Sequence, residues 1–324
     1  MTVQYIAEIG NNHNGDISLA KKMVDAAVKA KADFVKFQVY NVDKFVTKRN
    51  IYYDEFIFEK LNFDEFRALK RYTDSKKGKF LATPFDEDSL NLLDEMGLKK
   101  IKIASGDMNN WQLLERAVML NMELMISVGG ATLDEIDQTV DFLNKKKGKF
   151  SILHCISKYP AEFSDLNLRF IKSIKDRYSV PIGFSDHSKG IEASLGAIAL
   201  DAEIIEKHFT TDSSLPGGDN EMSVLPEEFN RLVIEGNHIL ESLGTGNRIV
   251  SNGEKEIREV IRRKIYAKNN INAGDILKSD DIILLRPDSY NAGLDSNHYP
   301  NILGKRLKLN IKKGDLLTMD MING

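Results

Sequence analysis

The stretch that decides the fold is residues 3–38, VQYIAEIGNNHNGDISLAKKMVDAAVKAKADFVKFQ. Its first seven residues are mostly apolar, aromatic or β-branched, which is typical of a buried strand. A polar loop follows, and apolar residues then recur near the helical period over residues 17–32, with Asp16 as the expected N-cap. Residues 33–38 are a second candidate strand. A strand, a loop, a helix and a strand in this order predict a βαβ unit.

The same alternation repeats as far as residue 243. After the first unit, the predicted strands are residues 33–38, 79–83, 100–104, 123–128, 150–154, 181–184 and 203–207. The predicted helices are residues 64–77, 87–96, 111–120, 133–146, 166–177, 191–200 and 226–243. Eight strand–helix units of this total length match a closed barrel better than an open doubly wound sheet. We therefore expect a (β/α)8 TIM barrel over residues 1–243.

A smaller module follows the barrel. Residues 244–253 are rich in glycine, asparagine and serine and read as a linker, and the charged stretch 254–263 is compatible with a short helix. From residue 264 onward, short strand-like runs alternate with turns, including the related turns NAGD at 272–275 and KKGD at 312–315. We expect a linker over residues 244–263 and a mostly β module over residues 264–324.

The composition narrows the class of protein. The 324 residues are 42% hydrophobic with a net charge of −3, which gives no electrostatic reason to expect nucleic acid or an anionic membrane as a partner. Cys155 is the only cysteine, so an intrachain disulfide and a multi-cysteine metal site are excluded. No secretory signal or long apolar run stands out, and a reducing, cytoplasmic location is expected.

Every predicted strand ends in polar residues. Any one of them has an ordinary structural explanation, since a lone histidine or lysine after a strand is usually satisfied locally or solvated. In a TIM barrel, however, the C-terminal strand ends meet on one rim, where the chemistry takes place. Eight polar strand ends therefore predict a single active site. The residues concerned lie within the segments 8–15, 36–38, 82–85, 102–106, 127–130, 154–160, 185–188 and 206–209.

The residue types on this rim suggest what it binds. Lys36 and Lys102 can attract a small phosphorylated anion, which neighbouring hydroxyl groups would complete with hydrogen bonds. Two histidines at the ends of the last two strands can converge on one divalent metal, with water and substrate oxygens as further ligands. Glu8 and Asp219 supply carboxylates for proton transfer or for holding sugar hydroxyls. The hydroxyl groups are those of Thr83, Ser105, Ser127 and Ser185, and the histidines are His187 and His208.

The motifs in this order resemble the N-acetylneuraminate synthase family, which also includes pseudaminic and legionaminic acid synthases. The resemblance covers nearly the whole chain, and the C-terminal part is similar to the family's antifreeze-like (SAF) domain. The motifs are IAEIG at 6–10, NHNGD at 12–16, VKFQ at 35–38, ATPFD at 82–86, KIASG at 102–106, LHC at 153–155, FSDH at 184–187, IEKHF at 205–209, LRP at 285–287 and ILGKR at 302–306.

The resemblance implies a function and a role for each matched residue. The implied reaction condenses phosphoenolpyruvate with an N-acetylated amino-sugar aldehyde, and phosphate leaves by C–O cleavage. Glu8, His208 and Asp219 would be catalytic, and a divalent metal at His187 and His208 would be Mn²⁺, with Mg²⁺ and Co²⁺ as alternatives. Phosphoenolpyruvate would bind at Lys36, Thr83, Lys102, Ser105, Ser127, Ser157 and Ser185. The sugar would contact Gln38 and Tyr159, besides Glu8 and Asp219, and Arg286 of a SAF domain supplied by the partner chain of a domain-swapped homodimer.

Four departures from the family pattern leave the sugar open. Ser157 stands where relatives often carry asparagine, residues 217–220 read GGDN instead of the more usual Gly-Pro-Asp, Asp288 replaces a glycine, and residues 40–62 are shorter than in many relatives. The acceptor is therefore N-acetylmannosamine, a bacterial diamino sugar or a phosphorylated variant.

Two other functions remain open from the residues alone. A Schiff-base TIM-barrel aldolase or lyase would use Lys36 or Lys207 as its nucleophile. A non-catalytic carbohydrate-binding protein would rely on the C-terminal module.

Overall fold

The computed structural model describes residues 2–287 and 293–322, so Asp288 lies outside the described residues. It divides into two compact units, Met1–Thr245 and Gly246–Gly324. Within the described residues, no helix is both long and apolar enough to cross a membrane.

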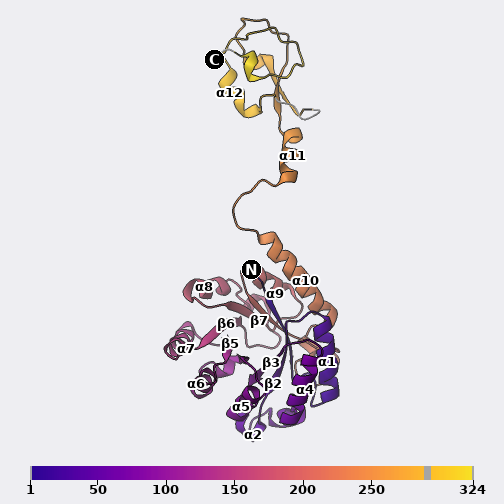
Figure 1. Ribbon diagram of the computed structural model, residues 1–324, viewed down its shortest axis with the longest axis vertical. Coiled ribbons are helices and arrows are strands. Elements are labelled where there is room, and N and C mark those ends of the chain that lie inside the picture. The colour runs from indigo at the N-terminus through magenta and orange to yellow at the C-terminus, as the bar shows by residue number, and fades with distance from the viewer. Residues whose placement is uncertain (1, 288–292, 323–324) are drawn as a thin grey trace. The chain divides into compact units, whose positions relative to one another are not determined.

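The first unit is the expected (β/α)8 barrel (Figure 1). Its parallel strands run in the order β3-β2-β1-β8-β7-β6-β5-β4, and the two terminal strands of this order, β3 and β4, lie against each other, which closes the sheet. The strands are β1 Gln4–Gly10, β2 Phe34–Val39, β3 Phe80–Pro84, β4 Lys100–Ile103, β5 Glu123–Ser127, β6 Lys149–Cys155, β7 Ile182–Asp186 and β8 Ile204–His208.

Helices surround the strands and bury their outer faces. Asp16 caps the first helix as expected, accepting hydrogen bonds from the backbone N–H groups of Ser18 and Leu19. The helices are α1 Ile17–Lys29, α2 Val42–Phe45, α3 Tyr53–Glu59, α4 Phe63–Ser75, α5 Glu87–Glu95, α6 Trp111–Met119, α7 Leu133–Lys145, α8 Phe170–Arg177, α9 Glu192–Ala199 and α10 Pro226–Leu243. Short 3₁₀ segments lie at Ser105–Asp107, Phe163–Asp165 and Asn220–Met222.

The helix pattern differs from the prediction in two places. The helix expected from residue 166 begins only at Phe170, because Asn167 has a φ of 43°, which interrupts helical backbone. The connection between β2 and α4, where no helix was predicted, contains α2 and α3.

The alternation of side chains along each strand separates the barrel interior from the helical layer. An apolar floor of Ile6, Leu81, Met125, Leu153 and Ile204 fills the interior. Residues two and four positions further along a strand face the same interior above this floor. The floor therefore places polar side chains near the C-terminal strand ends within one enclosed space.

The second unit is small and has its own apolar core. The turns at residues 272–275 and 312–315 are related, as expected: in each, an aspartate accepts a hydrogen bond from the backbone N–H three residues earlier, and Ile271 pairs with Ile311 between them. Its elements are α11 Asn252–Ile261, β9 Lys264–Ala267, β10 Ile282–Leu285 and α12 Tyr299–Ile302, with 3₁₀ segments at Ser279–Asp281, Ser296–His298 and Met319–Met321, and β9 pairs antiparallel with β10.

Candidate active site

A pocket of about 320 Å³ opens at the C-terminal ends of the barrel strands. All eight strands, or the residues that directly follow them, contribute to its wall. The lining residues are Glu8, Lys36, Gln38, Thr83, Phe85, Lys102, Ala104, Ser105, Gly106, Ser127, Cys155, Ser157, Tyr159, Ser185, His187, Glu206 and His208.

The pocket brings together every predicted site residue except two. Asp219 lies just beyond the lining, where its Oδ2 is 3.3 Å from Nδ1 of His208. Arg286 is exposed and belongs to the second unit. Its predicted contact with the sugar stays a prediction.

A buried cluster of alternating charges forms one wall of the pocket. The ammonium of Lys36 is 2.5 Å from Oε2 of Glu8 and 3.6 Å from Oε2 of Glu206, and that of Lys102 is 3.6 Å from Oε1 of Glu206. All four side chains are at most 5% exposed. We call Glu8, Lys36, Lys102 and Glu206 the open cluster, because it faces the pocket.

The two carboxyl groups of the open cluster differ in pKa. Burial opposes ionisation of Glu206, but Lys102 and Lys36 outweigh it and lower the pKa of Glu206 to about 2. Burial dominates at Glu8 and raises its pKa to about 7, although Lys36 opposes the shift. Burial also disfavours the Lys36 cation, but Glu206 and Glu8 outweigh it and raise the pKa of Lys36. The cluster therefore contains a carboxyl group that can take up or release a proton near neutral pH.

Hydroxyl groups extend this polar wall. Lys102 donates to Oγ of Ser127 at 2.6 Å, Lys36 donates to Oγ1 of Thr83 at 3.1 Å, and Ser185 donates to Glu206 at 2.8 Å. At Gly129, whose N–H donates to Ser105, a Cβ atom would lie 2.3 Å from Oγ of Ser157. A side chain at residue 129 would therefore displace the Ser157 hydroxyl from its present position in the pocket.

Two histidines, at the ends of β7 and β8, line another part of the pocket. The ring centroids of His187 and His208 are 5.3 Å apart, and Tyr159 stacks on His187 with a centroid distance of 4.1 Å. Burial lowers the pKa of His187 to about 4 and that of His208 to about 3. Both imidazoles are therefore neutral at physiological pH, the form that binds metals.

The free nitrogen atoms of the two imidazoles fit a metal. Nδ1 of His187 is 2.8 Å from the carbonyl oxygen of Ile156, to which it can donate, and this tautomer leaves Nε2 as a lone-pair donor. Nδ1 of His208 is buried and makes no hydrogen bond within the part of the chain that the structure describes; its polar contact is Oδ2 of Asp219, 3.3 Å away. No group of three or more histidine, cysteine, aspartate or glutamate residues in the described chain could hold a metal. The protein thus offers two imidazoles, and further ligands would have to be water or substrate oxygens.

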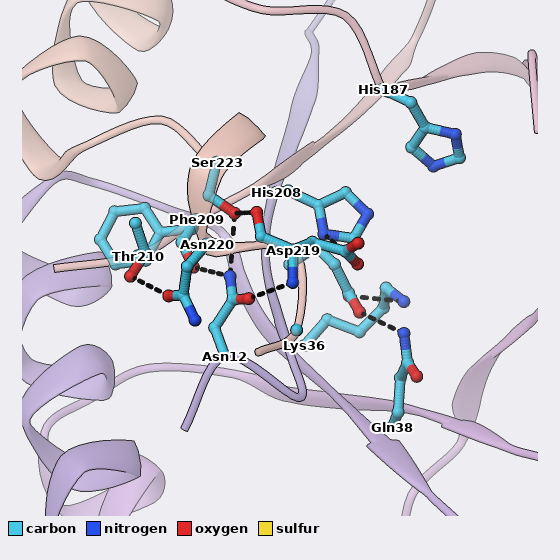
Figure 2. Close-up of polar contacts among 12 residues, drawn as sticks. Asn12, Lys36, Gln38, His187, His208, Phe209, Thr210, Asp219, Asn220 and Ser223 are labelled. Carbon is cyan, nitrogen blue, oxygen red and sulfur yellow. Dashed lines mark hydrogen bonds and ion pairs between the residues drawn. The ribbon is translucent and has the colours of Figure 1, made fainter. Parts of the chain in front are cut away.

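Hydrogen bonds join the loop that carries Asp219 to the loop after β1 (Figure 2). Oδ1 of Asn12 accepts a hydrogen bond from the backbone N–H of Asp219 at 2.8 Å, and its Nδ2 donates to the carbonyl oxygen of Phe209 and to Oγ of Ser223. The segment that follows β8 is therefore held close to the strand end that carries His208.

Comparisons with known proteins agree with this arrangement. A model described as the NeuB family matches residues 23–248, more than half of the chain. The chain belongs to the NeuB family. A second model, described as the SAF domain, matches residues 262–323.

The NeuB-family chain has relatives of similar length. It is 36% identical to the N,N'-diacetyllegionaminic acid synthase of Campylobacter jejuni, over 96% of this chain and 98% of that protein. It is 35% identical to the N,N'-diacetyllegionaminic acid synthase of Legionella pneumophila, over 99% and 95% of the two chains. The crystal structure of an N-acetylneuraminic acid (sialic acid) synthetase from Leptospira borgpetersenii has 42% identity and a TM-score of 0.77, covering 80% of this chain and 91% of that one.

Sequence reasoning missed several pocket residues of the NeuB-family chain. Glu206 lies in the predicted rim segment 206–209 but was given no catalytic or substrate-binding role, yet it lines the pocket and forms ion pairs with both lysines. The signal was available, since Glu206 and His208 are two positions apart on one strand and must face the same side. Cys155, Phe85, Ala104 and Gly106 also line the pocket; they lie within the predicted rim segments, but no individual role was predicted for them.

The same alternation removes one candidate nucleophile. Lys207 lies between Glu206 and His208 and faces away from the pocket, where it forms a 3.0 Å ion pair with Asp186. It is 1% exposed and does not line the pocket.

Proposed function

We propose that this NeuB-family chain is a nonulosonic acid synthase. It joins phosphoenolpyruvate to the aldehyde of an N-acetylated amino sugar, N-acetylmannosamine or a bacterial diamino-sugar analogue, and releases phosphate by C–O cleavage. The observation that carries the proposal is one pocket that holds two buried lysines together with two neutral imidazoles. The relatives named as legionaminic acid and N-acetylneuraminic acid synthases support it.

Phosphoenolpyruvate would bind at the lysine side of the pocket. Lys36 and Lys102 supply the charge, and their carboxylate neighbours keep the wall close to neutral before the anion enters. Because the pKa of Glu8 is about 7, this residue can take up a proton when the anion adds negative charge. The hydroxyl donors to the anion would be Thr83, Ser105, Ser127, Ser157 and Ser185.

The amino sugar would bind near the histidines. Tyr159 stacks on His187, Asp219 lies beside His208, and Gln38 lines the same pocket next to Glu8. His187 and His208 would hold a divalent cation, Mn²⁺ with Mg²⁺ or Co²⁺ as alternatives. When bound, such a cation supplies Lewis-acid polarisation of the aldehyde oxygen.

The reaction then forms one C–C bond and breaks one C–O bond. C3 of phosphoenolpyruvate attacks the aldehyde carbon, water adds at C2, and the resulting tetrahedral intermediate expels phosphate together with the bridging oxygen. Lys36 and Lys102 stabilise the charge on the departing group. Glu8 can exchange a proton with the new hydroxyl group or with the attacking water at neutral pH, and Asp219 is the second carboxylate within reach of the sugar.

The two alternative functions are less well supported. A Schiff base requires a neutral amine, but the pKa of Lys36 is raised by Glu206 and Glu8, and Lys207 does not face the pocket. A non-catalytic sugar-binding protein would have no use for the buried open cluster. Two relatives that match over nearly the whole chain are named as N,N'-diacetyllegionaminic acid synthases.

We also propose a cytoplasmic homodimer in which the SAF domain of one chain caps the barrel of the other. A cap would exclude water from the open mouth and bring Arg286 to the sugar. Mixing Arg286→Ala chains with Lys36→Ala chains should restore activity, because one site of the heterodimer then has both residues. Verified heterodimers without any recovery would contradict the shared site.

The proposal is tested by phosphate release over a panel of amino sugars. Phosphate should appear only when phosphoenolpyruvate, a divalent metal and one of the amino sugars are present together, and exhaustive chelation should abolish it. Release that is independent of the sugar, or full activity after chelation, would contradict the proposed reaction or the proposed metal. Borohydride trapping of a keto acid on the protein would instead support the Schiff-base alternative.

A further inference from the structure

The position of the Asp219 carboxylate depends on a short glycine-rich segment of the loop between β8 and α10. Gly217 and Gly218 have φ angles of 72° and 53°, in the left-handed region that favours glycine. A Cβ atom on Gly218 would lie 2.9 Å from Oδ1 of Asn12. Glycines alone do not hold a loop in one conformation, so the contacts made by this segment must do so.

Glu59, at the end of α3, makes one of these contacts. Its Oε1 accepts a hydrogen bond from the backbone N–H of Gly218 at 2.7 Å, across 159 positions of sequence. Its side chain is buried, with 2% exposed, and within residues 2–287 and 293–322 it forms no ion pair. A buried carboxylate without a cation is costly, and hydrogen bonds from amides are what stabilise it. The hydrogen bond with Gly218 therefore stabilises both the Glu59 carboxylate and the conformation of the loop.

Asn12 makes the next contact along the loop. It is 1% exposed, and its Oδ1 accepts from the N–H of Asp219, one residue after the amide that Glu59 holds. Its Nδ2 is fixed by two further acceptors, Phe209 and Ser223, as Figure 2 shows. Two successive amides are thus held from two sides, by α3 and by the loop after β1. The next group along is the Asp219 carboxylate, 3.3 Å from His208.

We propose that Glu59 and Asn12 are positioning residues that hold the Gly218–Asp219 peptide so that the Asp219 carboxylate faces His208. Neither residue lines the pocket, so neither touches the substrates itself. The proposal rests on the proposed function for the role of Asp219. The two hydrogen bonds to the Gly218 and Asp219 amides, which we call the clamp, are a property of the fold. It makes Glu59 a determinant of acceptor-sugar use.

The experiment compares Glu59→Ala with Glu59→Gln, which keeps the Oε1 acceptor and removes the charge. Glu55→Ala is the matched control, since Glu55 is an exposed glutamate one turn earlier on α3. Asn12→Ala tests the second contact. Each variant is measured for kcat and KM with the amino sugar and with phosphoenolpyruvate, for its thermal midpoint, and for amide hydrogen exchange over residues 217–224.

Glu59→Ala should lose about ten- to a hundred-fold in kcat/KM for the sugar, the scale of leaving one buried N–H donor without an acceptor, while KM for phosphoenolpyruvate changes by less than about three-fold. Glu59→Gln should recover most of this loss, and Glu55→Ala should match the wild type. The Gly218 and Asp219 amides should exchange faster in Glu59→Ala, whereas the amide of Val224, bonded to the His208 carbonyl, should stay protected.

Three results would overturn the proposal. They are wild-type sugar kinetics in Glu59→Ala, an equal loss for both substrates, and a Glu59→Gln variant as impaired as Glu59→Ala. Amide exchange separates this proposal from the proposed function. If the wild type makes no nonulosonic acid yet the Gly218 and Asp219 amides lose protection in Glu59→Ala, the function is wrong and the clamp stands. Unchanged exchange in Glu59→Ala and in Asn12→Ala means that there is no clamp.

Discussion

Two clusters of buried lysine and carboxylate lie on opposite faces of the barrel sheet. The open cluster joins Lys36 and Lys102 to Glu8 and Glu206 inside the barrel. The second, which we call the closed cluster, joins Lys207 to Asp186, Ser188 and Ser194 between the barrel and α9. Both bury their lysines almost completely, with at most 4% of each side chain exposed.

The two clusters differ in how well their polar atoms are satisfied. In the closed cluster, Oδ1 of Asp186 accepts from the N–H and the hydroxyl of Ser188, its Oδ2 accepts from Ser194 and pairs with Lys207, and Lys207 donates to the Ser188 carbonyl. In the open cluster, Oε2 of Glu8 pairs with Lys36 at 2.5 Å, but Oε2 of Glu206 has no hydrogen bond with a described residue and only a 3.6 Å ion pair with Lys36. Buried charge that is fully satisfied stabilises one structure, whereas buried charge left partly unsatisfied beside a cavity is available to a ligand.

The largest expected effect is on stability, from the closed cluster. Lys207→Met leaves the Asp186 carboxylate buried without its cation, and the free energy of unfolding should fall by roughly 3–5 kcal/mol. Urea unfolding measures the loss. The double variant Lys207→Met/Asp186→Asn should recover part of it, because neither charge then remains. The folded fraction of Lys207→Met should keep its affinity for phosphoenolpyruvate, and a ten-fold loss of that affinity would show that the two clusters are not separate in function.

His13 shows what burial does to a titratable group that forms no ion pair with any residue the structure describes. Burial lowers its pKa from 6.5 to about 4. Between these values the unfolded chain binds the proton and the folded chain does not, so stability is lost as the pH falls through this window. The full window is worth roughly 3 kcal/mol.

The measurement compares urea unfolding of the wild type and of His13→Asn at about pH 7.5 and about pH 4.5. The asparagine can still accept the hydrogen bond that His13 accepts from Gly15. The variant should lose less stability on acidification than the wild type, by roughly 2–3 kcal/mol. Parallel pH profiles for the two proteins would mean that His13 is not buried as a neutral residue.

The third prediction concerns anion affinity at the open cluster. Lys36→Met and Lys102→Met should each weaken phosphoenolpyruvate binding about ten- to a hundred-fold, because each removes a charge-assisted contact worth roughly 1.5–3 kcal/mol. Calorimetry with phosphoenolpyruvate measures the change. Stability should change less than in Lys207→Met, since Glu8, with a pKa of about 7, can become neutral by taking a proton. Wild-type affinity in both variants would place the anion elsewhere.

The sequence predicted the barrel and most of the pocket for one physical reason. The C-terminal ends of parallel barrel strands converge, so a polar residue at each end can be placed on one rim without knowing any contact. The role of Glu206 was not predicted, because the alternation of side chains along β8 was not used. This alternation puts Glu206 on the same side of the strand as His208. Glu59 could not have been placed, because α3 lies in a segment without a clear helical pattern and its partner Gly218 is 159 positions away.

The central claim is that the open cluster and the two histidines together perform a condensation with C–O cleavage. The most direct test uses phosphoenolpyruvate labelled with ¹⁸O in the bridging C–O–P position, incubated with protein, a divalent metal and the accepted amino sugar. We predict that the released phosphate carries the label and that release requires the sugar. Unlabelled phosphate, or labelled phosphate formed without the sugar, would contradict the account.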